Sequence, residues 1–105
     1  MDKGKYIKEL KNFVKKLSKD FKIKEIILFG SRAKGTEKED SDIDLIIVSP
    51  DFEGMDFFER GAQMYDYWDL RIPIDFICYT DKEFNILKKR ITIVKEASEN
   101  GIIIK

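Results

Sequence analysis

The sequence predicts an α/β (α+β) domain in which helices flank a small mixed β-sheet. Short apolar runs alternate with amphipathic stretches of helical period, in the order helix, strand, turn, strand, helix, strand, helix. The 105 residues are enough for one domain with one compact core. Two carboxylates, Asp42 and Asp44, stand at the mouth of an apolar strand that follows a Gly-Ser turn. Residues 1–105 are therefore expected to form a single domain.

The first half of the chain contains one helix and two strands. An amphipathic helix is expected over about residues 3–20, because its apolar residues recur at steps of three and four while lysines occupy the other side. The runs 24–29 and 43–48 are short and rich in Ile, Leu and Val, which is typical of buried strands. Between them, Ser31 to Lys34 should form one helical turn ended by Gly35, and the polar residues 36–41 a loop.

The second half continues with a helix over about residues 56–69 and a strand over 74–79. Thr80 and Glu83 have the spacing of a capping box, so a helix with Phe84 and Leu87 inward should follow. Helical spacing resumes after a break near residues 90–92 and continues to about residue 99, and residues 102–104 could form a terminal strand. The residues expected on one face of the helix over 56–69 are Phe57, Phe58, Gly61, Met64, Tyr65 and Trp68.

Strand directions follow if the Gly-Ser turn and the acidic residues serve one site. The end of the first strand must then lie beside the start of the second, so these strands should run antiparallel. Asp75 lies near the start of the third strand, which must therefore run parallel to the second, with the helix over 56–69 as the crossover. The expected core is a mixed three-stranded sheet.

Composition excludes several kinds of protein. Lysine plus arginine and aspartate plus glutamate each number 20, and this zero net charge argues against general nucleic-acid binding. The chain has no histidine, so a bound metal should be hard and held by oxygen ligands. With one cysteine, Cys78, and no apolar run of about 18 residues, we expect a cytoplasmic protein without a disulfide, signal peptide or membrane span.

Three carboxylates are candidate catalytic and metal-binding residues: Asp42, Asp44 and Asp75. Side chains two apart on a strand point to the same side, so Asp42 and Asp44 could hold divalent cations together. Asp75 interrupts an apolar strand, where a buried unpaired carboxylate would be costly, and it could complete the site and accept a proton. Two Mg²⁺ ions in such a site would suit phosphoryl or nucleotidyl transfer.

The Gly-Ser turn is the candidate phosphate-binding element. Gly30 lacks a Cβ and would let the backbone approach a triphosphate, and Ser31 could donate its hydroxyl and amide. Arg32 and Lys34 could add positive charge beside it. Taken alone, a Gly-Ser turn is usually only a turn, and Arg32 and Lys34 could be surface charges.

The segments GSRAKG, SDIDLIIV and IPIDFICYT together resemble the DNA polymerase β-like nucleotidyltransferase superfamily. They look most like the small prokaryotic minimal nucleotidyltransferases of the antitoxin type, over nearly the whole chain. The resemblance implies the nucleotidyltransferase fold, nucleotide phosphates at Gly30 and Ser31, and metals at the three aspartates. Lys34 stands where family members often have arginine, which keeps the charge but loses a bidentate fork.

The resemblance further implies transfer of AMP from ATP to a partner protein, in known cases a HEPN-domain toxin. A minimal fold leaves the acceptor side of the site open, so a macromolecular acceptor and assembly with it, or self-association, are expected. The main alternative is a non-catalytic antitoxin that neutralises its partner by binding. A third possibility, that the chain is one half of a split nucleotidyltransferase acting on a small molecule such as an aminoglycoside, ranks low. Templated polymerisation ranks lower still, because no region remains to hold a duplex.

Other notable residues have simpler interpretations. Arg60 should be solvated or ion-paired, and Cys78 should be a small buried residue, since no base for a nucleophile is identifiable. The aromatic residues of the helix over 56–69 should lie mostly in the core. The helix has more aromatic residues than the core needs, and the remaining ones would suit a protein interface.

Overall fold

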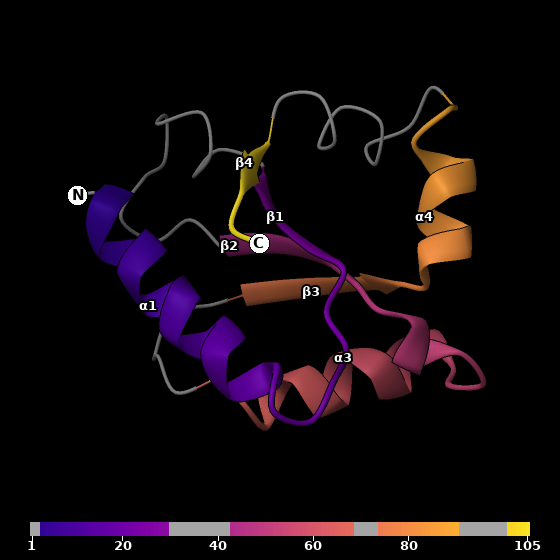
Figure 1. Ribbon diagram of the computed structural model, residues 1–105, viewed down its shortest axis with the longest axis horizontal. Helices are drawn as coiled ribbons and strands as arrows, with labels where there is room; N and C mark the ends of the chain where they lie inside the picture. The colour runs from indigo at the N-terminus through magenta and orange to yellow at the C-terminus, as the bar shows by residue number, and fades with distance from the viewer. Residues whose placement is uncertain (1–2, 30–42, 69–73, 91–100) are drawn as a thin grey trace.

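The computed structural model describes residues 3–29, 43–68, 74–90 and 101–105 (Figure 1). Every strand predicted from the apolar runs is present, and the second and third have the predicted bounds. The elements, in chain order, are α1 (Lys3–Leu17), β1 (Glu25–Phe29), β2 (Ile43–Val48), the 3₁₀ helix η1 (Pro50–Phe52), α3 (Phe57–Tyr65), β3 (Ile74–Tyr79), α4 (Asp81–Leu87) and β4 (Ile102–Ile103).

The strands form one mixed sheet in the order β3-β2-β1-β4. As predicted, β1 is antiparallel to β2 and β3 is parallel to β2. The sheet has four strands, however, because β4 pairs antiparallel with β1, where Ile27 lies opposite Ile103. The expectation of three strands was wrong in this respect: the terminal apolar residues cover the edge of β1 that β2 leaves open, and so satisfy its backbone hydrogen bonds.

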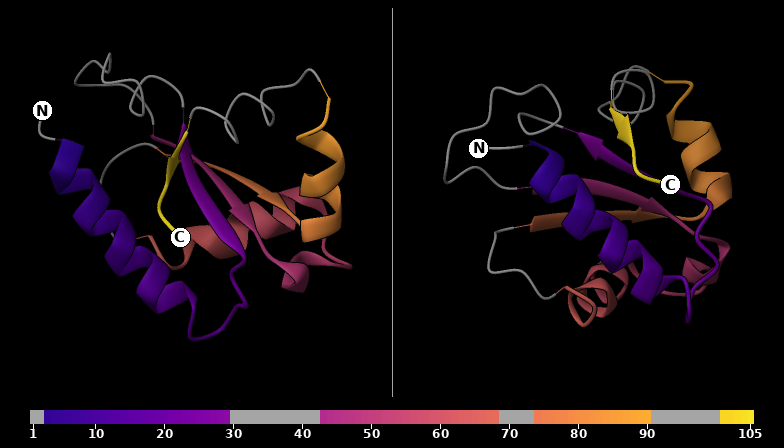
Figure 2. Two further views of the ribbon diagram at one scale, coloured as in Figure 1. Left: turned by 45° about the horizontal axis from the view of Figure 1, so that its top comes forward. Right: turned by 60° about the vertical axis from the view of Figure 1, so that its left-hand side comes forward.

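Each face of the sheet has its own apolar core. Leu10, Phe13 and Leu17 of α1 and Met64 of α3 pack with alternate residues of the strands on one face. Phe84 and Leu87 of α4 pack with the intervening strand residues on the other face. Figure 2 shows α1 and α3 on one side of the sheet and α4 on the other. This layering follows from the period of two along each strand, which gives both faces apolar side chains.

The helices are shorter than their apolar periodicity suggested. α1 ends at Leu17 rather than near residue 20, because Lys19 and Asp20 donate backbone hydrogen bonds three residues back and tighten the last turn. α4 begins with the predicted capping box, in which Glu83 N donates to Thr80 Oγ1 (3.1 Å) and Thr80 N donates to Glu83 Oε1 (2.8 Å). α4 ends at Leu87, and the helical spacing predicted beyond residue 90 lies outside the described residues. None of the described helices is long and apolar enough to cross a membrane.

α3 differs most from its prediction. It spans nine residues instead of about fourteen, with Asp56 as its N-cap. The side chains that it buries are Arg60 and Met64, whereas Phe58 is 86% exposed and Phe57 and Tyr65 are each 50% exposed. The predicted inward face was therefore wrong for Phe58, while Phe57 and Tyr65 are only half covered. Apolar side chains on both sides of a short helix do not determine its rotation, and the hydrogen bonds made by Arg60 decide it here.

Candidate active site

Two of the predicted site residues, Asp44 and Asp75, lie at one end of the sheet. Phe29, the last residue of β1, lies opposite Asp44 of β2. Asp44 in turn lies beside Asp75 in the parallel register of β2 and β3. The end of β1 therefore adjoins the starts of β2 and β3, which is the arrangement inferred from the sequence. Gly30 and Ser31 follow Phe29 directly in the sequence.

Asp44 and Asp75 point to the same face of the sheet, because paired residues of neighbouring strands share a face. It is the face that α4 covers, since Ile46 and Ile77, two residues further along each strand, pack with Phe84. α4 follows the opposite end of β3, so the residues of α4 do not cover the end of this face where Asp44 and Asp75 lie (Figure 1). Asp75 is exposed and Asp44 is half-buried.

The exposure of Asp75 corrects one step of the sequence argument. β3 alternates between buried and more exposed residues, and Asp75 occupies an exposed position near its start. A carboxylate in an apolar run was expected to be buried and to need a partner for that reason. The run is instead an edge strand, with Ile74 and Phe76 facing one core and Asp75 facing outward. The placement of Asp75 beside Asp44, rather than its burial, is what supports a site.

The hydroxyl of Tyr65 holds the start of β3. It donates a hydrogen bond of 2.5 Å to the carbonyl oxygen of Ile74, directly before Asp75. The Tyr65 ring also packs edge-on against Phe76, with ring centroids 4.9 Å apart. The last turn of α3 is thereby attached to the residues on either side of Asp75. Sequence reasoning missed this contact, because an aromatic residue at helical spacing looks like a core residue.

Five of the predicted site residues lie outside the described residues: Gly30, Ser31, Arg32, Lys34 and Asp42. Their proposed roles at phosphates and metals remain predictions. Among the residues that the structure describes, no three His, Cys, Asp or Glu side chains form a metal-binding group. Two of the three predicted carboxylates, Asp44 and Asp75, are neighbours there. This donor set fits Mg²⁺, which prefers oxygen ligands and is commonly bound by one or two carboxylates together with substrate phosphates.

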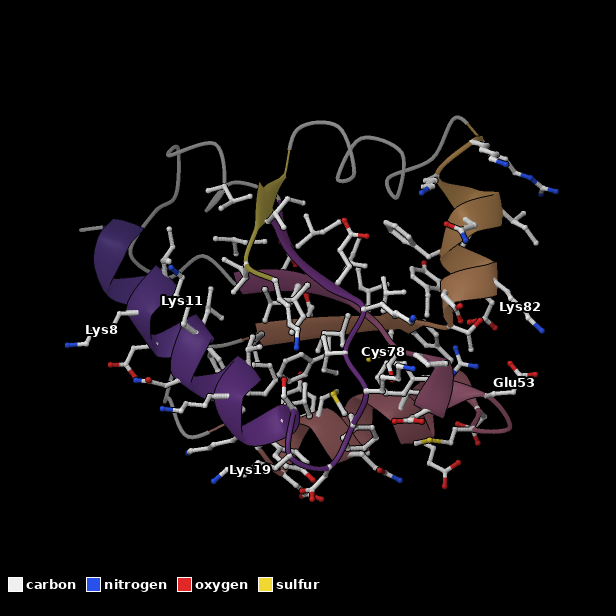
Figure 3. The ribbon with its side chains drawn as sticks, viewed as in Figure 1. Lys8, Lys11, Lys19, Glu53, Cys78 and Lys82 are labelled. Atoms are coloured by element: carbon white, nitrogen blue, oxygen red, sulfur yellow. The ribbon has the colours of Figure 1, made fainter. Side chains whose placement is uncertain are left out.

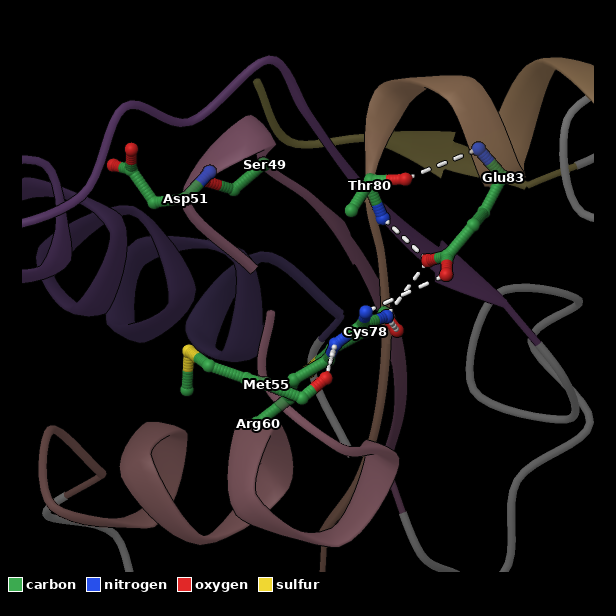
Figure 4. A network of polar contacts seen from close by, with 7 residues as sticks. All are labelled: Ser49, Asp51, Met55, Arg60, Cys78, Thr80 and Glu83. Atoms are coloured by element: carbon green, nitrogen blue, oxygen red, sulfur yellow. Dashed lines mark hydrogen bonds and ion pairs between the residues drawn. The ribbon is translucent and has the colours of Figure 1, made fainter. Parts of the chain in front are cut away.

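The opposite end of the sheet contains a different polar cluster, centred on Arg60 (Figure 4). Arg60 is 7% exposed, and its Nη1 lies 2.7 Å from Glu83 Oε1. It also donates to the carbonyl oxygens of Cys78 (3.1 Å) and Met55 (3.0 Å). The prediction of an ion pair is confirmed, while a solvated Arg60 is not what the structure has. This cluster links α3, β3 and α4, so we assign it to the fold rather than to the site.

Electrostatics at this end follow from the same contacts. Arg60 lowers the pKa of Glu83, chiefly through its hydrogen bond to the carboxylate. Burial raises the pKa of Tyr79 and raises that of the Cys78 thiol to about 12. Cys78 is 1% exposed and therefore protonated at neutral pH, which confirms it as a small buried residue and not a nucleophile.

A groove of about 250 Å³ lies over this cluster, between α3 and α4. Its lining combines an apolar rim with the ion pair, and consists of Phe57, Arg60, Tyr79, Glu83 and Leu87. It adjoins the last residue of β3, whereas Asp75 is near the first. The groove is therefore at the far end of the sheet from the carboxylate pair, and its location could not be predicted from the sequence.

Comparison with known proteins agrees with this geometry. A family model described as "Nucleotidyltransferase domain" matches residues 7–101. The Methanocaldococcus jannaschii protein named "Putative protein adenylyltransferase MJ1215" is 40% identical over 77 residues, which cover 68% of this chain and 83% of that protein.

Two solved structures have the same fold. One, described as a "putative nucleotidyltransferase" from Sulfolobus solfataricus, has a TM-score of 0.68 and 24% identity, covering 96% of this chain and 80% of the other. The other is a toxin-antitoxin structure with AMP-PNP, with a TM-score of 0.57 and 23% identity, covering 90% of this chain and 72% of the other. Since the family model spans nearly the whole sequence, the chain belongs to the nucleotidyltransferase domain family.

Proposed function

We propose that this nucleotidyltransferase moves AMP from ATP to a hydroxyl group of a partner protein. The observation that carries the proposal is the in-register pair Asp44 and Asp75, placed beside the end of the strand that leads into Gly30 and Ser31. The name of the Methanocaldococcus jannaschii relative supports a protein acceptor. The AMP-PNP of the similarly folded toxin-antitoxin structure supports an adenine nucleotide.

The proposed chemistry is an in-line displacement at the α-phosphorus of ATP. The acceptor oxygen forms a bond to this phosphorus, the bond to the β-phosphate oxygen breaks, and pyrophosphate leaves. The acceptor proton passes to the Asp75 carboxylate, which acts as general base. Two bound Mg²⁺ ions would neutralise the charge that develops on the attacking and leaving oxygens.

The chain's own residues divide this work. Asp42, Asp44 and Asp75 would hold the metals, with Asp44 and Asp75 in position on neighbouring strands. The backbone at Gly30 and the hydroxyl and amide of Ser31 would bind the phosphates, and Arg32 and Lys34 would add positive charge. Each of these contacts orients the triphosphate for attack, which is the main task of a protein in this reaction.

For the partner, we propose a toxin of the HEPN type, with this chain as its antitoxin. The similarly folded toxin-antitoxin structure supports a toxin as partner. Modification of a toxin hydroxyl by AMP would add a negative charge and bulk at that position, and so could inactivate it.

A second candidate function is neutralisation by binding alone. The exposed aromatic residues Phe57 and Phe58 favour it, because large apolar side chains at a surface are typical of protein interfaces. Under this alternative the carboxylate pair would be dispensable for protection of the host, whereas under AMP transfer it would be required.

The experiment that tests the proposal follows label from [α-³²P]ATP. The purified chain is incubated with Mg²⁺ and a lysate of its host, and the products are resolved on a denaturing gel. We expect one or more labelled protein bands with the wild type and none with Asp44→Asn. Glu25→Gln, at the first residue of β1 and the other end of the sheet, is the matched control and should label normally.

Binding of Mg-ATP is measured in parallel by calorimetry. A wild-type chain that binds Mg-ATP but labels no protein would exclude AMP transfer and leave neutralisation by binding. Equal labelling by the wild type and Asp44→Asn would contradict the role of the carboxylate pair.

A further inference from the structure

Three apolar side chains form a line along the exposed side of α3. Phe58, Ala62 and Tyr65 follow one another at steps of four and three residues, so they share one face of the helix. All three are exposed, Phe58 by 86%. Arg60 and Met64 face the sheet instead. Within the described part of the chain, α3 thus presents an apolar face to solvent.

The two ends of α3 contact the two ends of β3. Phe57, at the start of α3, packs against Tyr79, the last residue of β3, with ring centroids 6.5 Å apart. Tyr65, at the end of α3, bonds to Ile74, the first residue of β3. A nine-residue helix is about 14 Å long, so a partner lying along α3 would extend from the groove to the neighbourhood of Asp75.

The groove adds a cavity to one end of this face. Phe57 lines it, and the Phe58 ring lies beside the Phe57 ring with centroids 6.3 Å apart. Its ionic groups, Arg60 and Glu83, already satisfy each other. An apolar side chain of a partner could therefore enter beside Phe57 without leaving a charge unpaired.

The segment that contains α3 carries exposed charge of one sign. Within residues 50–68 the only cation is Arg60, which is buried and paired, while five carboxylates are exposed: Asp51, Glu53, Asp56, Glu59 and Asp66. Figure 3 shows Lys8 and Lys11 of α1 on the other side of the molecule from Glu53, whereas Lys82, in the first turn of α4, is on the same side as Glu53. A partner that covers α3 should therefore carry an apolar segment bordered by basic side chains.

We propose that the α3 surface, defined as Phe57, Phe58, Ala62 and Tyr65 with the adjoining groove, binds the protein that accepts the nucleotide. The acceptor would contact it through an apolar segment bordered by lysine or arginine. This inference rests on the proposed function. A second copy of the chain suits the surface less well, because a two-fold contact through α3 would place the carboxylates of both copies opposite each other.

The test measures transfer to the acceptor itself. The probe is the protein that takes up label in the lysate experiment, identified by mass spectrometry and purified. Two variants change the α3 surface, Phe58→Asp and Glu59→Lys. Two matched controls change exposed residues elsewhere: Ile103→Asp on β4, at the opposite edge of the sheet, and Lys11→Glu on α1.

We expect Phe58→Asp to raise the KM for the acceptor about tenfold or more, as loss of a central aromatic contact does at protein interfaces. The kcat and the affinity for Mg-ATP should change less than about twofold, because the carboxylate pair is untouched. Glu59→Lys should raise the KM less, and its effect should shrink at high salt. Both controls should behave as the wild type.

Three results would overturn this inference alone. A KM within about twofold of the wild-type value for Phe58→Asp would do so while leaving AMP transfer intact. Equal increases in the acceptor KM for Phe58→Asp and Ile103→Asp would show that the acceptor does not bind α3 in preference to β4. Dissociation of a wild-type dimer by Phe58→Asp, seen by sedimentation without a change in KM, would assign the surface to a second copy. Absence of labelled protein with the wild type would overturn the proposed function and this inference together.

Discussion

Carboxylates serve opposite purposes at the two ends of the sheet. At the end near α4, Glu83 receives hydrogen bonds from Arg60 and from the Thr80 backbone, so its charge is balanced inside the protein. At the other end, Asp44 and Asp75 are direct neighbours on parallel strands, with Asp75 exposed and Asp44 half-buried. Glu83 therefore helps to stabilise the fold, whereas the pair of aspartates is the candidate metal site.

This contrast predicts that mutations at the two ends of the sheet will have different effects. The Arg60 cluster joins α3, β3 and α4 through a single guanidinium and fixes the rotation of α3. The carboxylate pair lies where the starts of two strands meet the end of a third. Residues at the first end should therefore affect unfolding, and residues at the second end should affect transfer.

The largest effect is expected from Asp75→Asn. Loss of a metal-binding carboxylate and general base should lower AMP transfer about 1,000-fold, roughly 4 kcal/mol of transition-state stabilisation. The free energy of unfolding should change little, because Asp75 is exposed. Labelling assays and urea denaturation of the same preparation measure the two quantities. A large loss of stability would show that Asp75 supports the fold instead.

The second largest effect is expected from Arg60→Met, which removes the ion pair and the hydrogen bonds at the α4 end of the sheet. It leaves the carbonyl oxygens of Cys78 and Met55 without this donor and Glu83 without its cation. We expect the free energy of unfolding to fall by about 3 kcal/mol, at the lower limit for buried pairs because Glu83 is partly exposed. Urea denaturation measures it, and the affinity of the folded variant for Mg-ATP should be unchanged. A loss of affinity for Mg-ATP in the folded Arg60→Met variant would contradict the separation of the two ends.

The smallest effect is a pH dependence carried by Glu83. Arg60 lowers the pKa of Glu83 below the ordinary value of 4.5, so the unfolded chain takes up a proton at this group before the folded chain does. The stability that Glu83 contributes is present above the unfolded pKa and is lost as the pH falls through the folded pKa. The stability difference between the wild type and Glu83→Gln should therefore shrink as the pH falls from neutral through 4.5 and below. A difference independent of pH would exclude this ion pair as its cause.

Local sequence patterns predicted most of the elements, for identifiable reasons. β2 and β3 begin and end as predicted, because a polar loop or a proline bounds each apolar run. The capping box at Thr80 and Glu83 is present, since it depends only on residues three apart. The strand directions were inferred from the requirement that acidic residues and the Gly-Ser turn meet, and the register confirms them for Asp44 and Asp75.

Other features depended on contacts between distant residues. The side of α3 that faces the sheet is selected by the bonds of Arg60 to Cys78 and Glu83, residues 18 and 23 positions away. Apolar periodicity could not predict this, because Phe57, Phe58 and Tyr65 fit a core face equally well by spacing alone. The pairing of β4 with β1 likewise joins residues from opposite ends of the chain.

The sequence by itself identified the candidate site residues, since carboxylates at a strand mouth and a Gly-Ser turn follow from residue type and spacing. It also determined the order of the elements, because helix and strand periods are local properties. Only the tertiary structure decided that Asp75 is exposed beside Asp44, and that α3 turns Phe58 outward. The first outcome depends on β3 lying at the edge of the sheet, and the second on the hydrogen bonds of the buried Arg60 guanidinium. Both require contacts between residues that are distant in the sequence.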